Sequence, residues 1–211
     1  ADITPSNTPP TANDVFVATS EDSDSISGNF NANDPESSDQ LTYTITTIPT
    51  IGSVVVNSDG TFTYNFGNNF QSLGDGDTTD VVFEYIASNS NDIESAPATV
   101  TITINGRNDA PILSGTPFVL TNGAEDIPYI LKTSDLVQGY TDIDGDTLAI
   151  TSVTTGSANG TLTDNGNSTW TYTPTQDLNG EVVFSFVVSD GNGGTANGST
   201  SLTLDPVDDD V

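Results

Sequence analysis

The stretch Val100-Thr101-Ile102-Thr103-Ile104, followed by Asn105-Gly106-Arg107-Asn108-Asp109-Ala110-Pro111, decides how this chain is organised. Its first part alternates apolar and hydroxyl side chains, the period-2 pattern of a β-strand with one buried face. Its second part is short and polar and is closed by a proline, which is typical of a linker between domains. We therefore predict that a strand closes one domain here and that a second domain follows.

The same order of strand-like segments occurs on both sides of this linker. The corresponding pairs are Gly60–Tyr64 with Ser168–Tyr172, Val82–Tyr85 with Val183–Phe186, and Val100–Ile104 with Thr200–Leu204. Such internal repetition indicates one architecture used twice. Short alternating runs rich in Thr, Val, Ile, Phe and Tyr, separated by Asp/Asn/Gly turns, predict an all-β chain. Six or seven strands in about 100 residues predict two tandem immunoglobulin-like β-sandwich domains, at 8–107 and 108–207, stacked end to end.

Aromatic residues lie on single faces of the predicted strands. Phe62, Tyr64 and Phe66 share one face by their spacing, and so do Trp170 and Tyr172. Aromatic residues at period 2 in strands usually pack into a core, so we predict that these do. The alternative is a platform on which sugar rings stack.

The charge of the chain excludes several classes of function. Its 211 residues include 30 acidic and two basic side chains, for a net charge of −28, and no Cys, His or Met. Such a charge repels phosphate backbones and anionic lipid surfaces. Without Cys or His there is no zinc finger, thiol nucleophile, haem ligand or Ser-His-Asp triad. No apolar run approaches a membrane span of about 20 residues, and the absence of an initial Met suggests a segment of a longer protein.

The acidic residues gather in loops that a seven-strand sandwich sorts to the linker. Because strands alternate in direction, the loops after the first, third and fifth strands of the first domain lie with its exit, and the loops after the second, fourth and sixth strands of the second domain lie with its start. The predicted set is Glu21, Asp22, Asp75, Asp77, Asn105, Asn108, Asp109, Asp142, Asp144, Asp146 and Asp190. Carboxylates this close repel one another, and only Arg107 is nearby to neutralise them. Calcium, which takes six to eight oxygen ligands, fits better than magnesium, and transition metals usually recruit His or Cys.

Two local calcium motifs are excluded. Asp142-x-Asp144-x-Asp146 begins like an EF-hand loop, but Thr147 stands where that loop requires Gly and Val153 where it requires Glu. The turn that begins at Asp190 is a single glycine-rich turn, without the tandem repetition of a calcium β-roll.

Taken together, these motifs resemble the cadherin-like repeats of giant bacterial adhesins. The motifs are Asn108-Asp109-Ala110-Pro111, a Glu-Asp pair after the first strand, Asp142-Ile143-Asp144-Gly145-Asp146, and Ser189-Asp190-Gly191-Asn192-Gly193-Gly194. Residues 109–207 look like a bacterial cadherin-like domain, and residues 8–108 resemble the related VCBS repeat. Such repeats occur in large, calcium-dependent, RTX-type proteins secreted by the type I pathway, which serve in adhesion and biofilms.

The resemblance implies a calcium-rigidified extender, or stalk, at the bacterial cell surface. It implies calcium at the junction and a second site at the C-terminal end, completed by the next repeat. The second set is Glu125, Asp126, Asp177, Asp205 and Asp208. We expect a secreted monomer whose partners are adjacent repeats of the same chain, with glycans or cell surfaces bound by other domains. The chain departs from the pattern at Val207-Asp208-Asp209-Asp210 and at Ser90–Glu94, which lacks the Asp-Gly-x-Gly-Gly turn.

Two other functions would use different features of the sequence. A carbohydrate- or protein-binding module would use the long segment from Asn65 to Asp80, since long loops often carry function. A glycosidase with two carboxylates would need a pocket-forming insertion, and both domains look minimal. We therefore expect no enzymatic activity.

Overall fold

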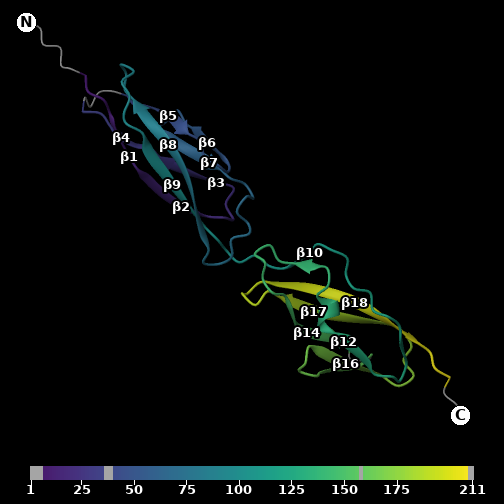
Figure 1. The fold of residues 1–211 in the computed structure, drawn as a ribbon. Coiled ribbons are helices and arrows are strands. Elements are labelled where there is room, and N and C mark those ends of the chain that lie inside the picture. Colours follow the sequence, from purple (N-terminus) through teal and green to yellow (C-terminus); the bar gives the residue numbers. More distant parts are fainter. Residues whose placement is uncertain (1–6, 36–39, 157–158, 209–211) are drawn as a thin grey trace, which may run out of the picture. The chain divides into compact units, whose positions relative to one another are not determined.

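A computed structural model describes residues 7–35, 40–156 and 159–208 of the chain. It consists of two compact units, residues 1–107 and 108–211, called domain 1 and domain 2 below. The division falls inside the predicted linker. Each domain is a nearly all-β sandwich, as the sequence predicted (Figure 1).

Domain 1 contains nine of the described strands. They are β1 (Thr11–Asn13), β2 (Val15–Ser20), β3 (Ser25–Asn29), β4 (Asn31–Asn33), β5 (Thr42–Thr47), β6 (Ser53–Val56), β7 (Thr61–Asn65), β8 (Thr78–Ser88) and β9 (Ala98–Asn105). One sheet has the order β2-β9-β8-β5 and the other β3-β7-β6, while β1 pairs with β4. Strand β2 runs parallel to the last strand of the domain, β9, with Ser20 opposite Asn105. This pairing brings the loop after β2 to the point where the chain leaves the domain.

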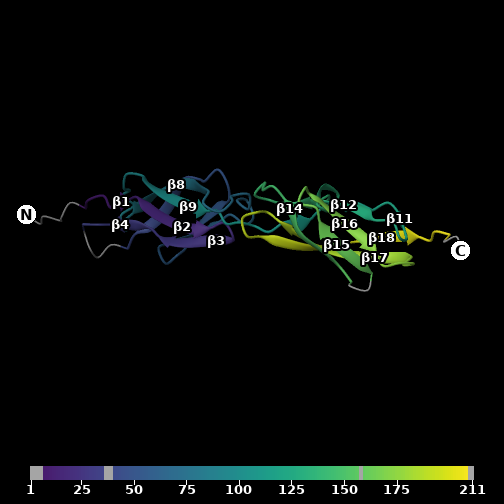
Figure 2. The same ribbon diagram turned by 90° about the horizontal axis from the view of Figure 1, so that it is seen from below.

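Domain 2 repeats this plan with small differences. Its elements are β10 (Ile112–Leu113), β11 (Gly123–Ala124), β12 (Tyr129–Lys132), α1 (Thr133–Leu136), β13 (Tyr140–Thr141), β14 (Ala149–Thr155), β15 (Gly160–Asp164), β16 (Thr169–Pro174), β17 (Gly180–Ser189) and β18 (Thr195–Asp205). The sheets have the orders β11-β18-β17-β14 and β12-β16-β15, labelled in Figure 2, and β10 pairs with β13. The parallel pair is β11 with β18. The single-turn helix α1 has no counterpart in the sequence prediction. Among the described residues, no helix is long and apolar enough to cross a membrane.

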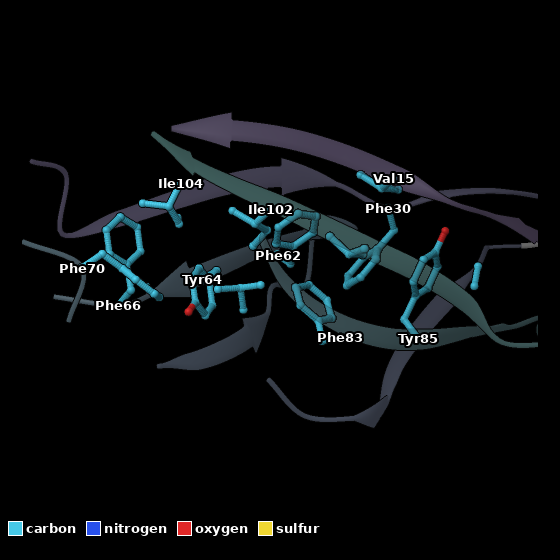
Figure 3. Close-up of a cluster of buried hydrophobic side chains, with 13 residues drawn as sticks. Val15, Phe30, Phe62, Tyr64, Phe66, Phe70, Phe83, Tyr85, Ile102 and Ile104 are labelled. Atoms are coloured by element: carbon cyan, nitrogen blue, oxygen red, sulfur yellow. The ribbon is translucent and has the colours of Figure 1, made fainter. Parts of the chain in front are cut away.

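Each domain has its own apolar core. In domain 1, Phe62, Tyr64 and Phe66 are fully buried between the sheets, beside Phe83 and Tyr85 (Figure 3). In domain 2, Tyr172 is fully buried against Phe184, and Trp170 is partly buried at the edge of the core. The aromatic residues therefore serve packing, as predicted, and Phe62, Tyr64, Phe66 and Tyr172 offer no face to a sugar.

The hydroxyl of Tyr85 ties two strands of domain 1 together. Its oxygen lies 2.7 Å from the carbonyl oxygen of Asn13 and 2.9 Å from that of Asn31, and it accepts a hydrogen bond from the backbone N–H of Asn31. Burial raises the pKa of this hydroxyl, so it stays protonated as a donor at neutral pH.

We predict that Tyr85→Phe destabilises domain 1 by about 1 kcal/mol, because it removes the hydrogen bonds of the hydroxyl to the backbone of Asn13 and Asn31. Urea unfolding followed by far-UV circular dichroism measures the loss. Trp170, the single tryptophan, lies in domain 2 and reports the unfolding of that domain alone. Its fluorescence transition should stay in place, and an unchanged transition for domain 1 would contradict this role of the hydroxyl.

Candidate metal centre

Glu21 is a buried carboxylate that holds the end of domain 1. It follows β2 directly and is 1% exposed. One carboxylate oxygen accepts from the backbone N–H of Arg107 and the other from that of Leu73, at 2.5 and 3.2 Å. Its own backbone N–H donates to the carbonyl of Asn105, 3.0 Å away. Within domain 1, Glu21 therefore fixes the exit of the chain, where the sequence placed it.

The other predicted residues of domain 1 surround this exit but are mostly exposed. Asp22, Asp75 and Asp77 are exposed at the surface. The carbonyl oxygen of Asp77 accepts from the N–H of Gly106 at 2.9 Å, and the side-chain amide of Asn105 donates to Thr19. Their backbone positions thus converge on the exit.

The long segment between β7 and β8 packs against the exit of domain 1. Phe70 is buried in the core, and the carbonyl of Leu73 accepts from the N–H of Arg107 at 3.0 Å. Gly106 passes so close to the carbonyls of Leu73 and Gly74 that a Cβ atom there would overlap them. This packing gives a structural role to the segment that the sequence offered as a ligand loop.

Asn108 and Asp109 are held by the acidic loops of domain 2. The side-chain amide of Asn108 donates to Oδ2 of Asp190 at 2.8 Å, and the backbone N–H of Asp109 donates to Oδ2 of Asp144 at 2.8 Å. Two consecutive residues are therefore bonded to two loops that are far apart in sequence. The sequence prediction brought these four residues together, and the structure does so within domain 2.

Asp190 is the organising carboxylate of the turn after β17. It is 4% exposed, and its Oδ1 accepts from the backbone N–H groups of Asn192, Gly193 and Gly194 at 2.8–3.0 Å. Burial raises the pKa of Asp190, but the hydrogen bonds from Asn108 and from these three amides outweigh it and hold the pKa below its usual value. Asp190 is therefore ionised at neutral pH without a basic partner.

Asp142, Asp144 and Asp146 form a compact cluster of carboxylates. Each offers an oxygen, and these oxygens all lie within 4.8 Å of one another. Oδ2 of Asp142 and Oδ1 of Asp144 are buried and have no hydrogen-bond partner. Asp146 accepts from the side-chain amide of Asn192, whose backbone N–H in turn donates to Asp190. Two buried, unsatisfied anionic oxygens in one cluster are costly unless a cation joins them.

Glu125 repeats the role of Glu21 at the other end of domain 2. It is buried, and its oxygens accept from the backbone N–H of Val207 at 2.7 Å and from the side-chain amide of Asn179 at 2.9 Å. The bond from Asn179 and then that from Val207 lower the pKa of Glu125, and burial opposes them. Its backbone N–H donates to the carbonyl of Asp205.

The remaining residues of the C-terminal set lie around Glu125 and are exposed. Asp126 accepts from the backbone N–H of Asp177, and the carboxylate of Asp205 accepts from Asn122. Asp208 is exposed at the surface, and Asp209 and Asp210 lie outside the described residues. Asp126 is thus hydrogen-bonded to the backbone of Asp177, and the backbone of Glu125 to that of Asp205.

The sequence prediction missed the asparagines that satisfy these carboxylates. Asn192 connects the Asp146 and Asp190 loops, and Asn179 binds Glu125. In a chain with two basic residues, amides are the obvious donors for buried carboxylates, so an Asn beside an acidic loop was the available signal.

Comparisons with known proteins agree with this architecture. The sequence profile of the bacterial cadherin-like domain matches residues 7–106, and that of the cadherin-like domain matches residues 107–205. A search of curated proteins found no match. Domain 1 is thus matched as a bacterial cadherin-like domain.

Solved structures resemble the chain in fold at low sequence identity. Protocadherin gammaB7 EC3-6 matches with a TM-score of 0.53 and 13% identity, over 95% of this chain and 48% of that one. Protocadherin Gamma B2 extracellular domains 3-6 match with a TM-score of 0.50 and 16% identity, over 95% and 48%. An endo-fucoidan hydrolase of glycoside hydrolase family 107 matches over 94% of this chain and 29% of its own, at 21% identity, but its TM-score of 0.37 is too low to relate its activity to this chain.

The chain spans about half or less of these solved chains, so they inform its fold and not a whole protein's function. The two profile matches together cover residues 7–205, and the two-sandwich structure agrees with both. This chain therefore belongs to the cadherin-like family and contains two of its domains in tandem.

Proposed function

We propose that this chain is a calcium-stabilised extender segment of a large bacterial surface adhesin. Cadherin-like domains are extracellular modules of adhesion proteins, typically without enzymatic activity, and they commonly bind calcium. The observation that carries the proposal is the pair of buried, partnerless carboxylate oxygens on Asp142 and Asp144.

The donor chemistry of this cluster fits calcium. Two carboxylates 5 Å apart repel by about 3 kcal/mol at an effective dielectric constant of 20, and domain 2 places three together. The ligands that domain 2 gathers in this cluster are the carboxylates of Asp142, Asp144 and Asp146. Calcium accepts many such oxygens, whereas magnesium keeps most of its water. A bound calcium ion would neutralise the cluster and fix the loops that hold Asn108 and Asp109.

The finer part of the proposal concerns the linker. Glu21 bonds the backbone of Arg107, and domain 2 bonds Asn108 and Asp109, whose chain is continuous with Arg107. Consecutive Cα atoms are about 3.8 Å apart, so little free chain separates the two sets of bonds. We propose that calcium uses the residues predicted at the linker, including Glu21, Asp22, Asp75 and Asp77, to stiffen it.

The same reasoning applies at the C-terminal end of domain 2. Glu125 bonds Val207 as Glu21 bonds Arg107, so Asp208 takes the sequence position of Asn108. We propose that a following repeat completes a second calcium site there. The chain would then be one segment of a secreted, RTX-type stalk in adhesion or biofilms, with neighbouring repeats as its partners and no self-association required.

We predict that calcium at 100 times its dissociation constant stabilises domain 2 by about 2.7 kcal/mol over chelator. Thermal unfolding followed by Trp170 fluorescence should shift upward by roughly 10 °C or more. An unchanged midpoint would contradict the proposed calcium site.

We predict that Asp144→Asn weakens calcium binding by at least about tenfold, because ligand charge sets the affinity of such sites. In chelator the variant should be at least as stable as the parent chain, since a repelling charge is gone. Calorimetric titration measures the affinity. Glu181→Gln, which removes an exposed charge from the same domain, is the matched control and should bind like the parent. A variant that is less stable in chelator and binds calcium normally would show a purely structural Asp144.

We predict that calcium increases the maximum dimension of the whole chain in small-angle scattering and narrows its distribution of interatomic distances. The reason is that neutralising the linker carboxylates removes the repulsion that loosens it. The same measurement on Asp144→Asn, at a calcium concentration that saturates only the parent, should resemble the chelated form. Identical scattering with calcium and with chelator would rule out the stiffening role.

A further inference from the structure

The turn after β8 in domain 1 corresponds to the turn after β17 in domain 2, but it carries an amide in place of the carboxylate. Asn89 follows β8 directly, as Asp190 follows β17. Both side chains are buried, at 3% and 4% exposure. The two residues therefore occupy equivalent places in the two sandwiches and differ in one atom of the side chain.

The hydrogen bonds fix the orientation of the Asn89 amide. Its Oδ1 accepts from the backbone N–H groups of Asn91 and Ile93, at 3.1 and 3.0 Å. Since a backbone N–H only donates, the oxygen must face this turn, and the NH2 group must face the other way. Asp190 likewise turns Oδ1 to the backbone of its own turn. What differs is the atom on the far side, which is an acceptor in Asp190 and a donor in Asn89.

The NH2 group of Asn89 points at three oxygens of three different chemical types. It lies 3.4 Å from the side-chain oxygen of Asn7, 3.3 Å from the carbonyl oxygen of Thr8 and 3.3 Å from a carboxylate oxygen of Asp34. Amide, carbonyl and carboxylate oxygens are the ligands that calcium prefers. In domain 1 these oxygens already surround a hydrogen-bond donor.

We infer that the Asn89 amide replaces a cation at the N-terminal end of domain 1. The NH2 group shares two protons among three oxygens and joins the start of the domain to the loop after β4, as a metal ion would. The amide brings no positive charge. Among the described residues, Asp34 is the carboxylate that contacts it, so little negative charge needs to be neutralised there. A cation there would meet the NH2 dipole at its positive end, so the three described oxygens around Asn89 hold the amide in place of calcium.

The two domains of one chain thus differ at this turn, because the far side of Asp190 accepts from the amide of Asn108 whereas the far side of Asn89 donates. Domain 2 gathers carboxylates that call for a cation, whereas domain 1 uses a neutral amide that works in any calcium concentration. The inference about domain 1 stands on its own contacts and goes beyond the proposed calcium site of domain 2.

Hydrogen–deuterium exchange of the whole chain, with calcium and with chelator, tests this inference. In the parent chain, peptides covering residues 89–95 should exchange at the same rate in both conditions, and peptides covering 190–196 should be slowed by calcium. Calcium protection of 89–95 by a factor similar to that of 190–196 would overturn the inference. Absence of protection in both segments would instead refute the proposed calcium site of domain 2 and agree with the inference for domain 1.

Asn89→Asp supplies the second arm, because it changes the donor to an acceptor at constant size. In chelator the 89–95 segment should exchange roughly tenfold or more faster, since three hydrogen bonds are replaced by repulsion between oxygens. Calcium should restore its protection. Asn91→Asp, at an exposed position of the same turn, is the charge-matched control and should show neither change. Exchange identical to the parent in chelator, or a loss that calcium does not restore, would show that the amide does not stand in for a cation.

Discussion

The constraint on which this structure depends is that buried carboxylates must be satisfied almost without basic side chains. The chain carries 30 acidic residues and two basic ones. An unpaired buried charge costs several kcal/mol, a large part of the 5–15 kcal/mol that stabilises a domain. Glu21, Glu125 and Asp190 meet this constraint through backbone N–H groups and asparagine amides. Each of these bonds also fixes a loop or a strand end. The same hydrogen bonds therefore satisfy the buried charges and position the loops.

The equivalent glutamates show how one solution is used twice. Each follows the first strand of the parallel pair, bonds the backbone two residues beyond the last strand, and donates its own N–H to the final residue of that strand. The chain therefore leaves each sandwich at a defined point.

Much of the fold was predictable because it follows from periodic pattern and chain direction. The alternation in Val100–Ile104 and its counterpart in domain 2 indicated strands, and the repeated order of segments indicated two copies of one sandwich. The alternation of strand direction was enough to sort the acidic loops, which is why Asp144 and Asp190 were expected beside Asn108 and Asp109. The helix α1 and the roles of Asn179 and Asn192 were not predicted, because a single turn has no readable period and an asparagine in a loop has many uses.

The sequence by itself determined an all-β chain of two similar domains, a boundary near residue 107 and acidic loops gathered at the ends of the sandwiches, since these depend on local pattern and topology. Only the tertiary structure decided which carboxylates are satisfied and which are not. Asp190 has four hydrogen-bond donors around it, while Asp142 and Asp144 each keep a buried oxygen without a partner. It also showed that Asn89 places a donor among oxygens where Asp190 presents an acceptor. The reason is that hydrogen bonds over 80 residues of sequence separation depend on where the packed sheets bring the loops, and no local pattern records that.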